Sequence, residues 1–253
     1  MHFLKLLKIE RIKCKRSKII PFIFIAPILV VSSGVANLST YFTPEYTQAW
    51  PAMFIQSALL YAYYLLPFSM IVVCVMIAGQ ENSHNGLLKM LALPVNRHTL
   101  SLAKFCILVF YLLMEILVFL AVFVIAGYIA VVTSGITETL PLSYLLKWCA
   151  GLFLTMLPSL SVMWMLTVLF EKPLLSVGLN LLLVIPGLLA GATPAWFLYP
   201  YCYSGYLVSR SLQAFTTEVT ADTALQLFPF IPCAVLIFTL ALFISASRFY
   251  KQT

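Results

Sequence analysis

Charged side chains are scarce in this sequence. Only 9% of its 253 residues are Asp, Glu, Lys or Arg, whereas 62% are hydrophobic and the mean hydropathy is +1.02. A soluble globular domain carries roughly 25% charged residues, so the composition excludes a soluble domain and indicates a protein of the lipid bilayer. The net charge of +7 would suggest nucleic-acid binding in a soluble protein, but here the basic residues cluster between apolar runs, and we expect no nucleic-acid partner.

Motifs of catalysis and metal binding are also lacking. The sequence contains no GxxxxGK[ST] loop for nucleotide phosphates, no HExxH, no GxSxG and no paired carboxylates. Its six cysteines show no CxxC spacing, and most lie in apolar runs, where cysteine behaves as a small hydrophobe. A disulfide among Cys149, Cys202 and Cys233 stays open because these three could lie toward one side. We therefore expect no catalytic residues, no metal site and no cofactor in this chain.

Six apolar stretches are each long enough to cross a bilayer as a helix, which takes about 20 residues. They run approximately over residues 19–40, 53–79, 105–132, 145–170, 174–193 and 226–247. Prolines inside them predict kinks or broken helices: Pro27, Pro67, Pro158, Pro186, Pro229 and Pro232. The spans and their connectors use the whole chain, so we predict an all-α membrane protein with a single transmembrane domain over residues 1–253.

The basic residues set the orientation of these spans. With the N-terminus inside the cell, thirteen of the fifteen basic residues fall on the cytoplasmic side, and only Lys147 and Arg210 lie outside. The opposite orientation would reverse that count. The positive-inside rule therefore predicts that both the N- and C-termini are cytoplasmic.

Residues 1–18 predict an amphipathic helix at the membrane surface. They carry seven basic side chains and one acid. Phe3, Leu6, Leu7 and Cys14 share one face of the helical wheel, and the opposite face is basic, with Lys5, Lys8, Arg11, Lys15 and Lys18. Such a helix is typical of one that lies on an anionic cytoplasmic leaflet. The alternative is a basic tail that only sets the topology.

The segment from Glu81 to Lys104 is the longest polar interruption between the apolar stretches, yet it has an apolar ridge. Asn82 and Ser83 are residue types that cap helices, and Glu81 beside them suits a helix N-terminus. Leucines then recur at helical spacing before a proline ends the run: Leu87, Leu88, Leu91 and Pro94. Leucines that face water need a partner groove, so we predict a short helix that a soluble partner grips. The ridge could instead lie on the membrane surface.

The external stretch from residue 194 to residue 225 is too apolar for a free loop and too interrupted by prolines and Gly205 for a full span. Its aromatic side chains resemble an interfacial belt: Trp196, Tyr199, Tyr201, Tyr203 and Tyr206. A pair of short re-entrant helices that dip into the outer leaflet would satisfy both facts. A surface loop with anchoring tyrosines is the alternative.

Glu115 is the one ionisable residue deep inside an apolar run. A charge near the bilayer centre costs about 3 kcal/mol on insertion scales, so this side chain should face the protein interior or be protonated. It could contact cargo or a proton, or it could form a structural hydrogen bond with a residue such as Ser159, Ser161 or Asn180. We assign Glu115, Tyr199, Tyr201 and Tyr203 to a candidate transport pathway.

The central segment resembles that of the type-two ABC exporter permeases. An acid closes the second span, a G-L-L-x-x-L-x-L-P pattern and a basic residue follow, and a lysine opens the third span: Glu81, Gly86, Leu87, Leu88, Pro94, Arg97 and Lys104. The six spans, the basic N-terminus and the aromatic external segment also look like that family, so the resemblance covers the whole chain. Its length and short connectors look most like the permease subunits of lantibiotic-immunity transporters.

The resemblance implies a coupling helix at residues 81–96, within a loop over residues 81–100, that docks in a groove of a separate ATPase. The residues in this role would be Glu81, Gly86, Leu87, Leu88, Leu91, Pro94 and Arg97. Two permeases, identical or paralogous, would pair with an ATPase dimer that binds ATP and Mg, and the resemblance favours a heterodimer. The 194–225 segment would close an outer gate, and the cargo of a bacterial plasma-membrane exporter of this branch would be a cationic, amphiphilic peptide.

Three classes of function stay open. The first is an ABC exporter permease that expels an amphiphilic peptide, another lipophilic drug or a lipid. The second is an ion-coupled carrier or channel that uses Glu115 and needs no ATPase. The third is an embedded enzyme, which no motif supports.

An acidic side chain on the apolar ridge should separate the permease from its ATPase. We expect Leu87→Asp or Leu91→Asp to leave the protein inserted in the membrane but to abolish co-purification of the ATPase, because a buried carboxylate in an apolar groove is costly. A pull-down from solubilised membranes measures this. A stable, active complex with either variant would contradict the role of the ridge.

Overall fold

The computed structural model describes residues 3–15, 17, 19–36, 49–82, 97–134, 140, 142–170, 172–216 and 227–251. Within these ranges the chain is helical and has no strand. Six of its helical segments are long and apolar enough to cross a membrane, as the sequence predicts: Ile19–Ala36, Ser57–Gln80, His98–Ile129, Leu142–Leu169, Pro173–Gly191 and Phe228–Arg248.

The described elements, in chain order, divide between the two halves of the chain. The α-helices of the first half are α1 (Phe3–Lys15), α2 (Ile19–Ala36), α4 (Ala49–Leu60), α5 (Leu66–Asn82) and α7 (Arg97–Ser134). A π-helix, η1 (Tyr61–Leu65), joins α4 to α5. The second half contains α8 (Leu142–Leu169), α9 (Pro173–Val184), α10 (Gly187–Gly191), the 3-10 helices η3 (Trp196–Leu198) and η4 (Pro200–Cys202), α11 (Tyr203–Thr216) and α12 (Leu227–Lys251).

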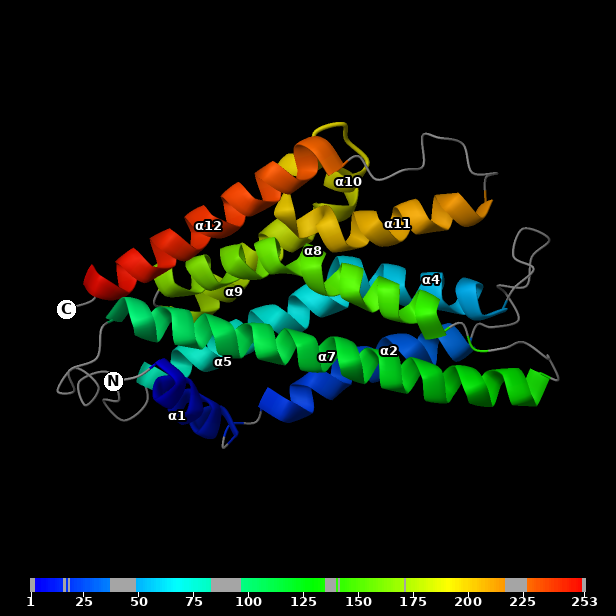
Figure 1. Ribbon diagram of the computed structural model, residues 1–253, viewed down its shortest axis with the longest axis horizontal. Coiled ribbons are helices and arrows are strands. Elements are labelled where there is room, and N and C mark those ends of the chain that lie inside the picture. Colours follow the sequence, from blue (N-terminus) through cyan, green and yellow to red (C-terminus); the bar gives the residue numbers. More distant parts are fainter. Residues whose placement is uncertain are drawn as a thin grey trace.

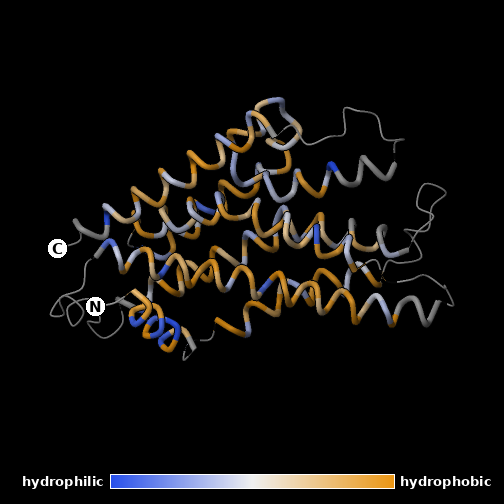
Figure 2. Tube along the Cα trace, in the orientation of Figure 1, coloured by the Kyte–Doolittle hydropathy of each residue, from blue (hydrophilic) through white to orange (hydrophobic). Residues whose placement is uncertain are grey.

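The long helices run roughly alongside one another as an elongated bundle (Figure 1). α7 packs against α1, α2, α8 and α12, and α8 packs against α5, α11 and α12. The short helix α1, the end of α5, the start of α7 and the end of α12 lie at one end of the bundle. The long helices are hydrophobic over most of their length, whereas hydrophilic and hydrophobic residues alternate in α1 (Figure 2).

Aromatic rings fill the centre of the bundle between the second and third spans. The ring of Tyr61 stacks on that of Phe119, with centroids 4.5 Å apart and planes 5° from parallel. Phe54 meets Phe123 edge-on at 5.4 Å. All four side chains are buried, and such ring pairs contribute about 0.5–1.5 kcal/mol each beyond their buried area.

The third helix begins earlier than the sequence predicts. α7 starts at Arg97 rather than near residue 105, so the polar stretch up to Lys104 belongs to the helix. The physical reason is that this stretch is covered: Leu100 and Ala103 pack with Leu6 of α1. The polar residues therefore extend a packed helix and do not form a loop.

The π-helix in the second span follows from Pro67. Proline has no N–H group and interrupts the regular ladder of an α-helix. In η1 the N–H of Leu66 donates to the carbonyl of Tyr61, five residues earlier. The carbonyl of Ala62 thus loses both nearby backbone donors, Leu66 and Pro67, and the hydroxyl of Ser204 donates to it instead at 2.9 Å. A side chain of α11 so satisfies a buried backbone group, as the bilayer interior requires.

The described part of the predicted external stretch, residues 194–216, contains short helices, but two of its tyrosines do not belong to a lipid-facing belt. η3 and η4 lead into α11, which runs from the middle of the bundle toward the end opposite α1 (Figure 1). Tyr201 and Tyr203 are only 2% and 1% exposed. The belt interpretation and the surface-loop alternative are therefore wrong for these two residues, because the other helices cover them.

The cysteines are all free. Cys149 and Cys202 are buried and Cys233 is partly exposed, and none is bonded to another. The disulfide that the sequence left open among these three is absent from the structure.

α11 lies very close to the second span at Gly205. A Cβ atom at this position would lie 2.3–2.4 Å from three ring atoms of Tyr63, and that ring is held by a 3.1 Å hydrogen bond between its hydroxyl and Ser209. We expect Gly205→Ala to destabilise the protein by about 1–3 kcal/mol through overpacking, measured as a lower thermal-unfolding midpoint in detergent.

Gly178→Ala is the matched control, since a Cβ atom at Gly178 in α9 meets nothing within 4 Å. This substitution should be neutral or stabilise the helix by up to about 1 kcal/mol. Equal midpoints for the Gly205 and Gly178 variants would contradict the close approach of α11 to Tyr63.

Candidate functional site

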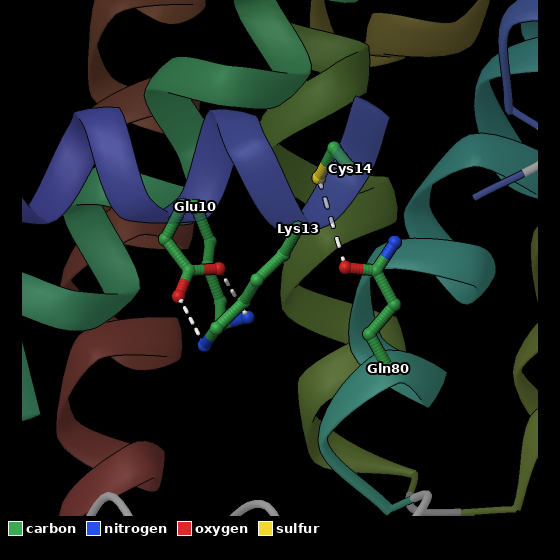
Figure 3. Close-up of polar contacts among 5 residues, drawn as sticks. Glu10, Lys13, Cys14 and Gln80 are labelled. Carbon is green, nitrogen blue, oxygen red and sulfur yellow. Dashed lines mark hydrogen bonds and ion pairs between the residues drawn. The ribbon is translucent and has the colours of Figure 1, made fainter. Parts of the chain in front are cut away.

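The predicted coupling segment is flanked by a polar junction that sequence reasoning missed. We call it the α1 junction and define it by Glu10 and Cys14 of α1, Gln80 of α5 and Lys104 of α7. The Glu10 carboxylate accepts hydrogen bonds from Lys104 Nζ at 3.0 Å and from Lys13 Nζ at 2.8 Å. The Cys14 thiol donates to Gln80 Oε1 at 3.7 Å. Figure 3 shows Cys14 of α1 directed at Gln80 of α5, with the Glu10 carboxylate and Lys13 on the same helix.

The ion pair in the α1 junction is removed from solvent. The side chains of Glu10 and Lys104 are each 1% exposed, whereas that of Lys13 is 38% exposed. Burial acts to raise the pKa of the Glu10 carboxyl, but the positive charges of Lys104 and Lys13 and their hydrogen bonds outweigh it, so the pKa lies below its ordinary value. Glu10 is therefore an ionised counter-charge that makes the burial of Lys104 tolerable.

An apolar cluster and a cation–π contact also join α1 to α7. Leu6 packs with Leu100 and Ala103 of α7, and the guanidinium of Arg11 lies 5.2 Å from the centroid of the Phe110 ring. Removal of one partner of a buried ion pair strongly destabilises a protein, because the remaining charge is buried without an opposite charge. The ion pair thus specifies one position of α1 against α7.

The helix that the sequence predicts at the N-terminus is confirmed, but one of its faces is used differently. Leu6 and Cys14, which we placed on the face opposite the basic residues, are 2% and 1% exposed because α7 and α5 cover them. Glu10 lies four residues from each of them and shares their face, a signal by which it could have been found. Contact of α1 with the leaflet stays a prediction, and its exposed residues include Leu4, Ile12, Lys5 and Lys8.

Most of the predicted coupling residues lie outside the described ranges: Gly86, Leu87, Leu88, Leu91 and Pro94. The two residues that flank them are seen as backbone: Glu81 lies in the last turn of α5, which ends at Asn82, and Arg97 begins α7. Asn82 is the last residue of α5, which continues past the apolar run. The structure fixes where the segment leaves and re-enters the bundle, beside the α1 junction.

Glu115 is fully buried in α7 and is bonded to a residue that the sequence did not suggest. Its Oε1 atom lies 2.5 Å from the hydroxyl of Ser69 on α5. The candidate partners from the sequence bond elsewhere: Ser159 to the carbonyl of Met156, Ser161 to that of Pro158, and Asn180 to Ser176 and Tyr201. That expectation was wrong because the face of α7 that carries Glu115 meets α5.

The tyrosines of the candidate pathway bind other protein groups. The Tyr201 hydroxyl donates to Asn180 Oδ1 at 2.9 Å, the Tyr199 hydroxyl to the carbonyl of Leu183, and the Tyr203 hydroxyl to that of Phe197. Burial raises the pKa of all three phenols above the ordinary value. Tyr199 and Tyr201 tie the segment around η4 to α9, whereas Tyr203 ties α11 to η3. Their part in a pathway stays a prediction.

No group of three or more His, Cys, Asp or Glu side chains that could hold a metal ion occurs among the described residues. The polar groups that the structure does bring together include the α1 junction, the Glu115–Ser69 pair and the tyrosines around α9. These arrangements hold helices against one another.

The described residues form helices, six of which are long and apolar enough to cross a membrane, and polar side chains join these helices to one another. The chain is therefore a multi-pass membrane protein. The chain matches the ABC-2 family transporter protein family over residues 6–187. That match covers more than two thirds of the 253 residues, and the chain belongs to this family. It is therefore a membrane component of an ABC transporter, which works with an ABC ATPase subunit. A comparison with curated protein sequences finds no significant match.

The buried ion pair should respond to loss of one partner far more than to loss of both. We expect Lys104→Met to destabilise the protein by about 3–5 kcal/mol, since it leaves Glu10 buried beside Lys13 alone, and the double variant Glu10→Gln/Lys104→Met to recover most of this loss. Thermal unfolding in detergent measures stability. Thiol labelling of Cys14 in a Cys106→Ser/Cys233→Ser background measures whether α1 stays docked.

This ion pair also predicts a pH dependence. The pKa of Glu10 is lowered in the folded protein. The contribution of the Glu10 carboxylate to the free energy of unfolding is therefore fully present above the ordinary carboxyl pKa, and it is lost as the pH falls through the lowered pKa. The stability difference between the native protein and the double variant should therefore shrink in acid.

Equal unfolding midpoints for Lys104→Met and the double variant would show that the two charges are not coupled.

Proposed function

We propose that this chain is the permease subunit of an ATP-driven exporter in the bacterial plasma membrane, with both termini in the cytoplasm. The observation that supports it most is the α1 junction. It holds α1, α5 and α7 together at the two points where the predicted coupling segment leaves and re-enters the bundle. A force applied to that segment would reach three helices together.

The coupling residues would act through contact with the ATPase subunit. The apolar ridge of Leu87, Leu88 and Leu91 would fill a groove of the ATPase, while Glu81 and Arg97, at the ends of α5 and α7, would contact polar groups around it. ATP and Mg would bind to the ATPase and not to this chain. ATP binding can shift the permease between two arrangements only if the ATP-bound ATPase binds one arrangement more tightly than the other. In this proposal the coupling segment is the part of the chain that makes this contact.

A second permease would complete the transporter. Two copies of this chain, or this chain and a paralogue, would pair with two ATPase subunits, and a heterodimer fits the likeness to lantibiotic-immunity permeases. The external segment from η3 to α11 would close the outer side, since its buried tyrosines and Ser204 link it to α9 and to the second span.

The cargo that we propose is a cationic, amphiphilic peptide such as a lantibiotic, expelled from the membrane for self-immunity or resistance. The support is the sequence resemblance to that branch of the family. Export of another lipophilic drug or lipid is the alternative, and an ion-coupled carrier that uses Glu115 is a further one, favoured by the burial of an acid inside a span.

Deletion of the gene separates these cargo classes. We expect the deletion strain to become several-fold more sensitive to a cationic lantibiotic while its sensitivity to neutral lipophilic drugs stays unchanged, and the purified permease–ATPase complex to hydrolyse ATP faster when the peptide is added. Plasmid-borne Leu87→Asp should not restore resistance, whereas the native gene should. Unchanged peptide sensitivity would contradict the cargo, and sensitivity that follows the proton gradient and not ATP would favour the carrier.

A further inference from the structure

The centre of the membrane domain contains an incomplete polar group that the proposed function does not use. Glu115 Oε2 and the Tyr61 hydroxyl are both buried without a hydrogen-bond partner among the described residues. They belong to neighbouring positions, because the Tyr61 ring stacks on Phe119, one turn along α7 from Glu115, and the two groups interact electrostatically. Unsatisfied buried groups in a native protein are rare and need a reason.

The hydrogen count at Ser69 indicates which form of Glu115 is present. The Ser69 oxygen lies 2.9 Å from the carbonyl of Leu66 and 2.5 Å from Glu115 Oε1. A serine hydroxyl has one hydrogen but two acceptor lone pairs. If that hydrogen is donated to Leu66, the contact with Glu115 needs a second hydrogen, which a protonated carboxyl supplies. A neutral acid therefore satisfies all three groups in one chain, from Glu115 to Ser69 to Leu66.

The surroundings of Glu115 give a carboxylate no compensation. It is the only acid in the six candidate spans, and no salt bridge in the described part of the chain includes it. The titratable groups on the packed helices include the Tyr61 hydroxyl of η1, which interacts with Glu115 and with Cys149 of α8, and the buried Cys74 thiol of α5. The helices α2 and α4 carry no titratable side chain. An ionised group with one unbonded oxygen in such a place is costly.

We propose that Glu115, Ser69 and Tyr61 form a proton-binding site, loaded in this arrangement of the permease and emptied in the arrangement that ATP binding favours. In the loaded form, Glu115 is a neutral acid that donates to Ser69. On release the Glu115 O–H bond breaks, the proton passes to water and a carboxylate remains. Ser69 turns its hydrogen from Leu66 to the carboxylate, and Tyr61 donates to the second oxygen, so that both unbonded groups gain a partner.

The π-helix provides the movement that this exchange requires. Tyr61 begins η1, and the Ser69 hydroxyl is bonded to Leu66, the residue that follows η1. A π-helix contains one residue more per hydrogen-bonded turn than an α-helix and is frequent at functional sites. A change of register in η1 would therefore shift Tyr61 relative to Ser69 and bring it to Glu115. This proposal needs the family's two-state cycle but not a particular cargo.

Infrared difference spectroscopy of the permease–ATPase complex tests the proton site directly. We expect the complex without nucleotide to show the carbonyl band of a protonated carboxylic acid, and this band to be lost when a non-hydrolysable ATP analogue is added. Glu115→Gln should lack the band in both states. Glu10→Gln, the matched control, should leave it unchanged because Glu10 is ionised beside two lysines.

Further variants separate the parts of the site. Ser69→Ala should shift the band to higher frequency, since the acid loses its acceptor. Glu115→Asp is the alternative variant if Glu115→Gln fails to fold, and it should retain the band at a shifted frequency. Tyr61→Phe keeps the ring but should reduce the nucleotide-dependent loss of the band. Absence of an acid band in the native complex, or a Glu115 band that the analogue leaves unchanged, would overturn the proposal. A full loss of the band in Tyr61→Phe would exclude the two-donor carboxylate.

Discussion

The arrangement of the end of the bundle that contains α1 depends on one interaction, the buried ion pair between Glu10 and Lys104. Each ion loses several kcal/mol of solvation when it leaves water, and only a close, hydrogen-bonded opposite charge compensates for this. Lys104 meets that condition when α1 lies against the first turns of α7, because Glu10 then bonds to it. The pair so determines the position of α1, the helical start of α7 and, through Cys14 and Gln80, the end of α5.

The rest of the bundle follows a second constraint, which is that no backbone group inside a bilayer can stay without a partner. Pro67 removes one donor from the second span, and the chain responds with a π-helix and with the Ser204 hydroxyl of α11. The external segment is thus bonded to the place where the second span is least regular. Glu115 and Tyr61 lie beside the same irregular turn, so the proton site and the link to the external segment share one element.

The six spans could be predicted from the sequence because length and apolar composition decide whether a helix can cross a membrane. The contacts between them could not. Glu115 and Ser69 are 46 residues apart, and nothing in the composition of α7 says which helix covers its acid. Lys104 looked like the end of a loop, since its counter-charge lies 94 residues earlier. The tyrosines of the external segment looked like a lipid belt, because a pattern of aromatic residues does not show whether lipid or protein covers them.

The central claim is that this ABC-2 family chain moves its cargo only when a separate ATPase drives it through the end of the bundle beside the α1 junction. Reconstitution in liposomes tests this most directly, with the permease alone or together with its ATPase, ATP and a labelled cationic lantibiotic. The account predicts movement of the peptide out of the bilayer only when both proteins and ATP are present. Movement by the permease alone, at the same rate with and without the ATPase, would contradict it.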